Sequence, residues 1–272
     1  NAFPDSNNNQ ETNWQVVTSG DLPFTMPNPH DDILFIEQLI NHLQNDLNID
    51  SNRVYAMGYS NGGGFTFDLA CRLNEKITGI GVVARTMYIE SLNACSVSHP
   101  TPVITILGTE DYISPYNGAI YEGTLYYESA ETVNDYWIEV NNLLQDYELT
   151  LIPNTNTVDD STVELYHWES EDQCIEMFHY KVLGGDHDWP GTIGNMDIIS
   201  HNLIWDHLSN YGMNGKLECE SASLSYNDIN NSFNRKIEKV IDALGREVNA
   251  TTNQILFHIY DDGTVEKRFV VE

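Results

Sequence analysis

The sequence predicts an α/β protein, with a mostly parallel β-sheet covered by helices on both faces and a small all-β module after it. Continuous apolar runs at 77–84 and 102–108 are typical of strands that are buried on both faces. Helical segments separate these runs, as the crossover connections of a parallel sheet require. After residue 212 the composition becomes polar, and strand-like runs return near the end of the chain. We therefore expect one main domain and a smaller second one.

Composition and charge narrow the classes of partner. The chain has 272 residues, of which 41% are hydrophobic, enough to bury one sizeable core. Its formal net charge of -29 repels polyphosphates and anionic lipid surfaces, so nucleic acid is disfavoured as a partner. No apolar run is long enough to predict a membrane span. Such an acidic composition suits a protein that works outside the cell or in salty water.

The elements follow in order along the chain. The first thirty residues are rich in Asn, Asp and Pro and predict a loop. Asp31 or Asp32 then caps a helix, a role that fits this pair better than a metal site does. The apolar residues of this helix keep the helical period: Ile33, Ile36, Ile40, Leu43 and Leu47. Further strands are predicted at 54–57, 77–84, 102–108, 161–168 and 174–183, with helices around Val133, Trp137 and Val140 and over 196–211.

One stretch joins a strand end to a glycine-rich helix start. The strand 54–57 leads into Gly58-Tyr59-Ser60-Asn61-Gly62, and an amphipathic run follows. This pattern is typical of a nucleophile elbow, in which a tight strand-to-helix turn lifts the serine Oγ clear of the backbone. Small residues on either side permit that turn. Ser60 is therefore the candidate nucleophile, and a flexible turn after a strand is the alternative.

Two later loops hold a candidate acid and a candidate base. Asp111 closely follows the strand 102–108, so it lies at the same edge of the sheet as Ser60. His187 stands in a Gly- and Pro-rich loop after the strand 174–183, and none of the other eight of the nine histidines has such a position. An ordinary turn-forming Asp is the alternative for Asp111.

The chain order Ser60, Asp111, His187 is the order nucleophile, acid, base of α/β-hydrolases. His187 would take the proton of Ser60 as general base, and Asp111 would orient the imidazole, with Asp186 as a rival for that role. The backbone N–H of Asn61 would be one oxyanion donor. Only a neutral imidazole accepts a proton, so we expect activity to rise with pH as His187 loses its own.

Four segments resemble the secreted α/β-hydrolases that include feruloyl esterases, acetyl-xylan esterase relatives and polyhydroxybutyrate depolymerases. They are residues 31–40, 55–71, 108–116 and 184–191. The last is the most specific, because a His fixed between Gly-Gly and Trp-Pro-Gly is rare by chance. One departure is Asp186, which stands where the family usually has Gly.

This resemblance implies a serine esterase that works through an acyl-enzyme and needs no metal or organic cofactor. Ser60, Asp111 and His187 match the family's catalytic triad, and Tyr59 and Trp189 are candidates for substrate contact. Trp189 fits a wall of the acyl or sugar site, or plain core packing. The favoured substrates are feruloyl or acetyl esters of plant cell-wall polysaccharide, with polyhydroxyalkanoate as the alternative polymer. A non-catalytic surface protein that keeps the hydrolase fold for binding is the alternative from another class.

The C-terminal part predicts a separate module. Residues 213–235 are rich in Ser, Asn and acidic residues and predict a linker between a catalytic domain (1–212) and a β-rich module (236–272). The patterns Asp-x-Leu-Gly-Arg at 242–246 and Tyr-x-Asp-Gly at 260–263 resemble the C-terminal sorting domain of the type IX secretion system. That resemblance implies a secreted or cell-surface protein with the type IX machinery as a partner. A small β-module that binds carbohydrate or a partner is the alternative.

The cysteines and the N-terminus complete the predictions. Four cysteines are too widely spaced for a zinc site, and Cys71 with Cys95 is the preferred disulfide, with free buried thiols as the alternative. The chain begins at Asn1 without an initiator Met or an apolar signal core. One predicted strand precedes Ser60, whereas α/β-hydrolases place several there. We therefore expect the N-terminal strands and the second oxyanion donor to lie upstream.

Overall fold

The computed structural model describes residues 14, 31–121, 123–219, 236–242, 246–248, 254–261 and 265–270. The chain divides into two compact units, Asn1–Cys219 and Glu220–Glu272. The predicted N-terminal loop, apart from Trp14, and most of the predicted linker lie outside the described residues. None of the described helices has both the length and the hydrophobicity needed to cross a membrane.

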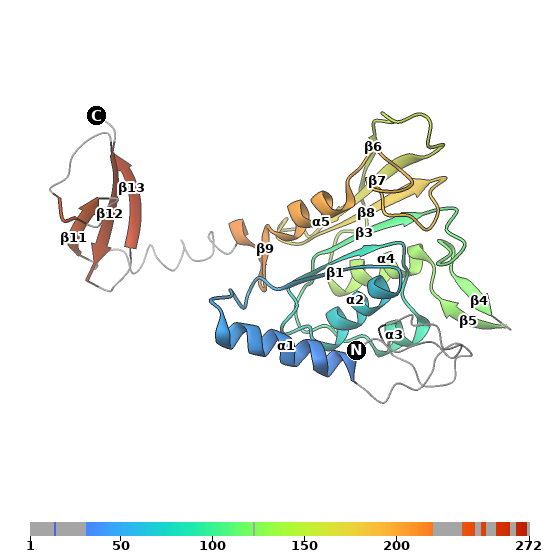
Figure 1. Ribbon diagram of the computed structural model, residues 1–272, viewed down its shortest axis with the longest axis horizontal. Helices are drawn as coiled ribbons and strands as arrows, with labels where there is room; N and C mark the ends of the chain where they lie inside the picture. The colour runs from blue at the N-terminus through green and yellow to red at the C-terminus, as the bar shows by residue number, and fades with distance from the viewer. Residues whose placement is uncertain are drawn as a thin grey trace. The chain divides into compact units, whose positions relative to one another are not determined.

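A six-stranded sheet forms the centre of the first unit (Figure 1). Its strand order is β1-β2-β3-β8-β7-β6, in which the first four strands are parallel and β7 runs antiparallel to both of its neighbours. The strands are β1 (Tyr55–Tyr59), β2 (Gly79–Val83), β3 (Val103–Gly108), β6 (Glu148–Ile152), β7 (Thr162–Glu169) and β8 (Glu176–Leu183). The mostly parallel arrangement agrees with the predicted α/β class, whereas β6 was not predicted.

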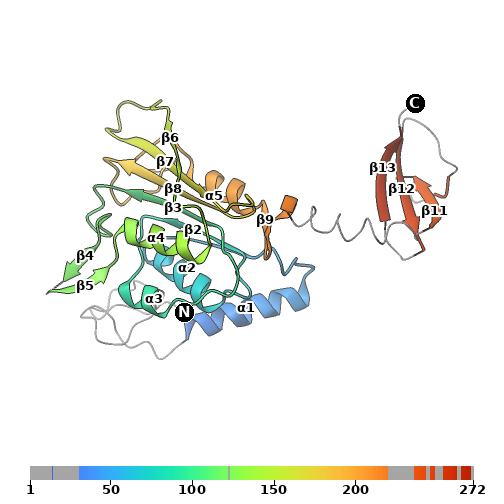
Figure 2. The same cartoon turned by 180° about the vertical axis from the view of Figure 1, so that it is seen from behind.

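Helices cover both faces of this sheet. They are α1 (Asp32–Asp46), α2 (Asn61–Arg72), α3 (Ile89–Ala94), α4 (Ala130–Val140) and α5 (Ser200–Leu208). Figures 1 and 2 show α5 on one face and α2 and α4 on the other. The side chains of β2 point to both faces of the sheet. Ile80 and Val82 pack in the hydrophobic core under α2, whereas Val83 packs against Ile204 of α5 on the other face. The predicted closing helix 196–211 is shorter in the structure.

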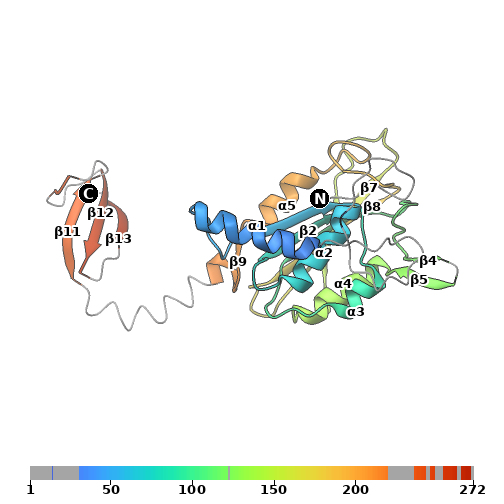
Figure 3. The same ribbon diagram turned by 60° about the horizontal axis from the view of Figure 1, so that its bottom comes forward.

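Helix α1 begins at an aspartate cap. The Asp31 carboxylate accepts a hydrogen bond from the Leu34 N–H (3.0 Å), so Asp31 rather than Asp32 is the N-cap. The helix packs against α2 through Ile33 and its neighbours one and two turns on (Figure 3). Leu43 and Leu47 keep the same helical period in the sequence, but they are 36% and 57% exposed.

The described part of the first unit also contains a hairpin and a short ribbon. The hairpin pairs β4 (Ala119–Tyr121) with β5 (Thr124–Tyr127), and the ribbon pairs β9 (Tyr211–Gly212) with β10 (Gly215–Lys216). Cys219 forms a disulfide with Cys174, so residues 213–219, predicted as linker, belong to the first unit. The preferred disulfide of the sequence analysis, Cys71–Cys95, is present.

The second unit contains an antiparallel sheet of three described strands, β11 (Ile237–Asp242), β12 (Gln254–Tyr260) and β13 (Val265–Val270). The sequence pattern of residues 239–248 predicts a single strand, but β11 ends at Asp242, and Glu247 pairs antiparallel with Ile241. Residues 246–248 run back along β11, where the Asp242 N–H donates to the Arg246 carbonyl and the Arg246 guanidinium binds the Asp242 carboxylate.

Candidate active site

Ser60 lies in a strained turn between β1 and α2. Its φ of +53° is in the left-handed region, which a non-glycine residue adopts only at a local energetic cost. Two backbone hydrogen bonds hold the turn: the Ser60 N–H donates to the Val83 carbonyl (3.0 Å), and the Gly64 N–H donates to the Ser60 carbonyl (3.1 Å). This is the backbone of the predicted nucleophile elbow.

The close approach of α2 to β1 requires a glycine at position 58, two residues before Ser60. A Cβ at Gly58 would overlap the carbonyl of Gly62 and the hydroxyl of Thr66. Any larger residue at position 58 would therefore push α2 away from β1. Since Ser60 sits between these two elements, such a shift would move its side chain as well.

The structure brings the three predicted triad residues together. His187 Nε2 lies 2.8 Å from Ser60 Oγ, and His187 Nδ1 lies 2.8 Å from Asp111 Oδ2. The three side chains follow β1, β8 and β3, whose carboxyl ends lie along one edge of the parallel part of the sheet. This arrangement gives a hydroxyl, an imidazole and a carboxylate in hydrogen-bonded series, which is the geometry of an activated serine nucleophile.

Asp111 is fixed by its own loop. Its side chain is buried, and the carboxylate oxygen that does not face His187 accepts hydrogen bonds from the Ile113 and Ser114 N–H groups (2.9 and 2.8 Å). The loop is joined to the base loop, because the Glu110 N–H donates to the Gly185 carbonyl (2.8 Å). This hydrogen bond fixes the loop of the acid and the loop of the base relative to each other.

Asp186, the rival orienter, makes a different contact. Its carboxylate accepts a hydrogen bond from the His187 backbone N–H (2.7 Å), whereas the His187 ring nitrogen binds Asp111. The Asp188 carboxylate in turn accepts from the Asp186 N–H (3.3 Å). Both neighbouring carboxylates thus shape the base loop through its backbone.

Comparison with known proteins points to one reaction class. No family model matches the chain. The bifunctional acetylxylan esterase/xylanase of Neocallimastix patriciarum is 26% identical over 184 residues, which cover 68% of this chain and 24% of that protein. Feruloyl esterase B of Piromyces equi is 29% identical over 92 residues, 33% of this chain and 17% of that protein. The chain resembles carboxylic-ester hydrolases.

A third esterase extends the likeness. Probable feruloyl esterase C of Aspergillus clavatus is 29% identical over 94 residues, which cover 34% of this chain and 33% of that protein. The chain therefore spans between 17% and 33% of the length of these three relatives. If this chain works as such an esterase, the other predicted site residues, Tyr59, Asn61 and Trp189, should lie around the nucleophile.

Tyr59 and Trp189, the candidates for substrate contact, lie beside the base. The Tyr59 hydroxyl donates to the His187 carbonyl (2.7 Å), and the Tyr59 and Trp189 rings meet edge to face at 5.9 Å. Trp189 is partly buried and also packs against the core under α5. The sequence does not predict the contact between Tyr59 and the base loop, because the motif only identifies Tyr59 as the residue beside the nucleophile.

The Asn61 side chain is engaged away from the reaction. Its carboxamide exchanges two hydrogen bonds with the backbone of Trp14, which donates to Oδ1 (2.7 Å) and accepts from Nδ2 (3.2 Å). The Trp14 ring stacks on Phe65 of α2 at 4.8 Å. The Asn61 side chain thus ties Trp14 to α2, and the Asn61 backbone N–H remains the candidate oxyanion donor.

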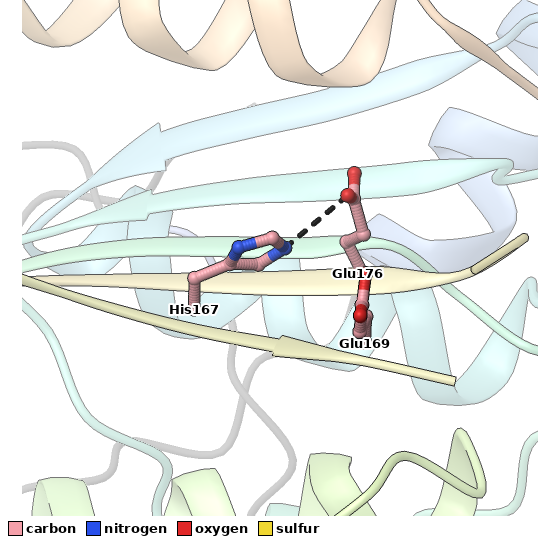
Figure 4. A group of neighbouring side chains, drawn as sticks. All are labelled: His167, Glu169 and Glu176. Atoms are coloured by element: carbon pink, nitrogen blue, oxygen red, sulfur yellow. Dashed lines mark hydrogen bonds and ion pairs between the residues drawn. The ribbon is translucent and has the colours of Figure 1, made fainter. Parts of the chain in front are cut away.

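In the part of the chain that the structure describes, one other cluster has the residue types of a metal site. Ligand atoms of His167, Glu169 and Glu176 lie within 4.8 Å of one another at the end of β8 opposite the base loop (Figure 4). Lys216 Nζ already lies 2.8 Å from Glu176 Oε1, and the Tyr211 hydroxyl donates to Oε2 (2.8 Å). Burial alone would raise the pKa of Glu176, but hydrogen bonds from His167, Lys216 and Tyr211 lower it to about 2. We therefore interpret the cluster as an ion-pair network that fastens the β9–β10 ribbon to the sheet.

Proposed function

We propose that this protein is a serine carboxylic-ester hydrolase that works through an acyl-enzyme. The observation that carries the proposal is the series Ser60, His187, Asp111, with 2.8 Å at each of its two links. The curated esterases that resemble the chain support the same reaction class. The reaction needs no metal or organic cofactor, because the serine itself is the nucleophile.

The first half-reaction acylates the serine. Ser60 Oγ attacks the ester carbonyl carbon while His187 Nε2 takes the hydroxyl proton, and Asp111 stabilises the resulting imidazolium. The Asn61 N–H, at the N-terminus of α2, donates to the developing oxyanion. His187 then gives its proton to the leaving alcohol, the bond between the carbonyl carbon and the alcohol oxygen breaks, and the acyl group stays on Ser60.

The second half-reaction releases the acid. His187 takes a proton from a water molecule, whose oxygen attacks the acyl carbon through a second tetrahedral intermediate. The ester bond to Ser60 breaks, His187 returns the proton to Oγ, and the carboxylic acid leaves. The same three side chains thus serve both steps.

The substrate we favour is a feruloyl or acetyl ester of plant cell-wall polysaccharide. Its support is the activity of the three relatives, two of which are feruloyl esterases and one an acetylxylan esterase/xylanase. Tyr59 and Trp189 would then contribute aromatic surface beside the base, suited to a sugar or a hydroxycinnamoyl ring.

We propose further that the protein works outside the cell. Two disulfides, Cys71–Cys95 and Cys174–Cys219, are typical of proteins that fold in oxidising compartments. The second unit would act as a sorting module for the type IX secretion machinery, a proposal that rests on its sequence patterns. The acidic composition fits the same environment.

Ser60→Ala tests the reaction. The wild type should hydrolyse 4-nitrophenyl acetate, and the variant should retain at most a few per cent of that activity with an unchanged circular dichroism spectrum. Ser51→Ala is the matched control, because this exposed serine lies in the turn before β1. Full turnover by Ser60→Ala would refute the proposed nucleophile. Feruloylated arabinoxylan oligosaccharide, acetylated xylan and a polyhydroxybutyrate film, assayed in parallel, identify the substrate class.

A further inference from the structure

A buried cation lies close to the nucleophile. Arg85 follows β2 at the carboxyl edge of the sheet, two residues after Val83, the residue that accepts the Ser60 N–H hydrogen bond. Arg85 is only 4% exposed. Burial of a guanidinium is unusual, because a charge removed from water needs compensation.

The segment of Arg85 also contacts the loop of the acid. The Thr86 N–H donates to the Ser114 hydroxyl (3.3 Å), and the Ser114 N–H donates to the Asp111 carboxylate (2.8 Å). The residues that follow β2 are therefore fastened both to the turn of the nucleophile and to the loop of the acid.

The Arg85 side chain runs along the first turn of α2. A Cβ added at Gly63 would lie 3.0 Å from Arg85 Cβ, and one added at Gly64 would lie 3.4 Å from Arg85 Nε. The N-terminus of a helix carries a partial positive charge from its free N–H groups. The guanidinium adds a full positive charge beside it, so the two together favour an anion strongly.

The described surroundings of Arg85 compensate its charge only in part. The guanidinium carbon lies 4.5 Å from the Tyr88 ring centre and 4.1 Å from that of Tyr127, and Nη2 donates to the Tyr88 hydroxyl. Among the described residues, Nε has no hydrogen-bond partner and no carboxylate lies within ion-pair distance of the guanidinium. Burial raises the pKa of Tyr126, which packs on Tyr88, to about 12, and it raises that of Tyr127 as well. These tyrosines therefore stay neutral and supply no counter-charge.

We propose that Arg85 and the N-terminus of α2 form a subsite for a carboxylate carried by the ester substrate, so that the enzyme acts on esters of acidic saccharides. This inference rests on the proposed esterase function. Tyr88 and Tyr127, the rings at the guanidinium, are buried, and the partly exposed ring of Tyr126, which packs on both, suits the apolar face of a sugar ring. An enzyme with a net charge of -29 repels acidic substrates at long range, so selectivity for them requires a local cation of this kind.

The test compares matched esters that differ by one carboxylate. Acetylated glucuronic acid is paired with acetylated glucose, and the 4-nitrophenyl monoester of adipic acid is paired with that of heptanoic acid. The whole polypeptide should show a higher kcat/KM for the charged member of at least one pair. Arg85→Met should lower that ratio by about 10- to 100-fold, mainly through KM, and Arg85→Lys should lower it less.

Several results would overturn the inference. An unchanged ratio in Arg85→Met, or equal losses for both members of each pair, would mean that Arg85 is structural. A preference for a neutral hydroxycinnamoyl ester that disappears in Arg85→Met would assign the subsite to a phenol instead. If Arg85→Met does not fold, Arg85→Lys decides: it keeps the charge but loses the planar guanidinium fork, so it should lower the ratio, and an unchanged ratio in Arg85→Lys contradicts the proposal. If no ester is hydrolysed, the proposed function fails; if esters are hydrolysed without preference for charge, only this inference fails.

Discussion

The Tyr59 hydroxyl donates a hydrogen bond to the His187 carbonyl at 2.7 Å, across 128 positions of sequence, and the two rings lie 5.1 Å apart. Tyr59 directly precedes the candidate nucleophile, so this contact joins the elbow to the loop of the base. Burial, and then the nearby carboxylates of Asp111, Asp188 and Asp186, raise the pKa of Tyr59. Its hydroxyl therefore stays protonated and remains a donor at neutral and moderately alkaline pH.

Tyr59→Phe should lower kcat by about 3- to 10-fold, because a neutral hydrogen bond that positions the base is lost while the ring remains. Steady-state kinetics with a chromogenic ester would measure this. Tyr55→Phe is the matched control, since its hydroxyl donates to the Tyr211 carbonyl (2.6 Å) at the other end of the same strand. Equal kcat values for Tyr59→Phe and the wild type would show that the contact does not position His187.

Asp111→Asn should lower kcat on the order of 10⁴-fold, because an amide at this position favours the wrong tautomer of His187. Asp186→Asn should have a far smaller effect, since the Asp186 carboxylate contacts the His187 backbone rather than its ring. The two variants assayed side by side decide which carboxylate is the acid. Greater damage from Asp186→Asn would reverse the assignment.

Local sequence was sufficient to find the three candidate catalytic residues. Each lies within a few residues of the end of a strand, and parallel strands bring their carboxyl ends to one edge, so order and spacing place Ser60, Asp111 and His187 near one another. The buried strands β2 and β3 were equally clear, because residues covered on both faces form unbroken apolar runs.

The contacts that support the site could not be predicted in the same way. The bond from Tyr59 to His187 and the pairing of Asn61 with Trp14 join residues that are distant in sequence and follow no period. Strand β6 was missed because it is a short, mostly exposed edge strand. In the sequence, Arg85 is recognisable as a lone cation after the apolar run of β2. Its burial, however, is shown only by its packing against α2 in the structure.

His207 predicts a loss of stability in acid. Burial lowers the pKa of His207 from the ordinary 6.5 to about 3, and its Nε2 has no hydrogen-bond partner among the described residues. Below about pH 6.5 the unfolded chain therefore binds a proton at this histidine, whereas the folded protein binds it only below about pH 3. Stability should be fully present above that range and decline as pH falls through it, by about 1.4 kcal/mol per pH unit from this group.

His207→Phe should reduce this acid sensitivity. The ring packs between Phe178 and Tyr211, at centre distances of 4.5 and 5.2 Å, so phenylalanine fits the same aromatic setting. Urea unfolding at a series of pH values would measure the slope for both proteins. The variant should lose stability less steeply between pH 6 and pH 4, and an identical slope would contradict the assignment of this loss to His207.

The C-terminal unit should be dispensable for catalysis. A chain that ends at Cys219 should retain the kcat of the whole protein, because the three candidate catalytic residues and both disulfides lie within Asn1–Cys219. A chain that ends at residue 212, the boundary predicted from sequence, should be less stable, since it loses β10, the Lys216 ion pair with Glu176 and the Cys174–Cys219 disulfide. Thermal unfolding and kcat of the two purified truncations would be compared with those of the whole chain.

Export separates the sorting proposal from a plain structural role of the same unit. In a host that carries a type IX secretion system, the chain that ends at Cys219 should stay inside the cell while the whole chain is exported, because the patterns at 242–246 and 260–263 would be the address. Substituting Asp242 with Ala removes the carboxylate that binds the Arg246 guanidinium at 2.7 Å and should weaken export without changing kcat. Export of the truncated chain at the level of the whole protein would refute the sorting role. Loss of kcat in the purified truncation would instead assign the second unit to catalysis, since only a contribution to the reaction or its substrate would lower turnover in the absence of any export step.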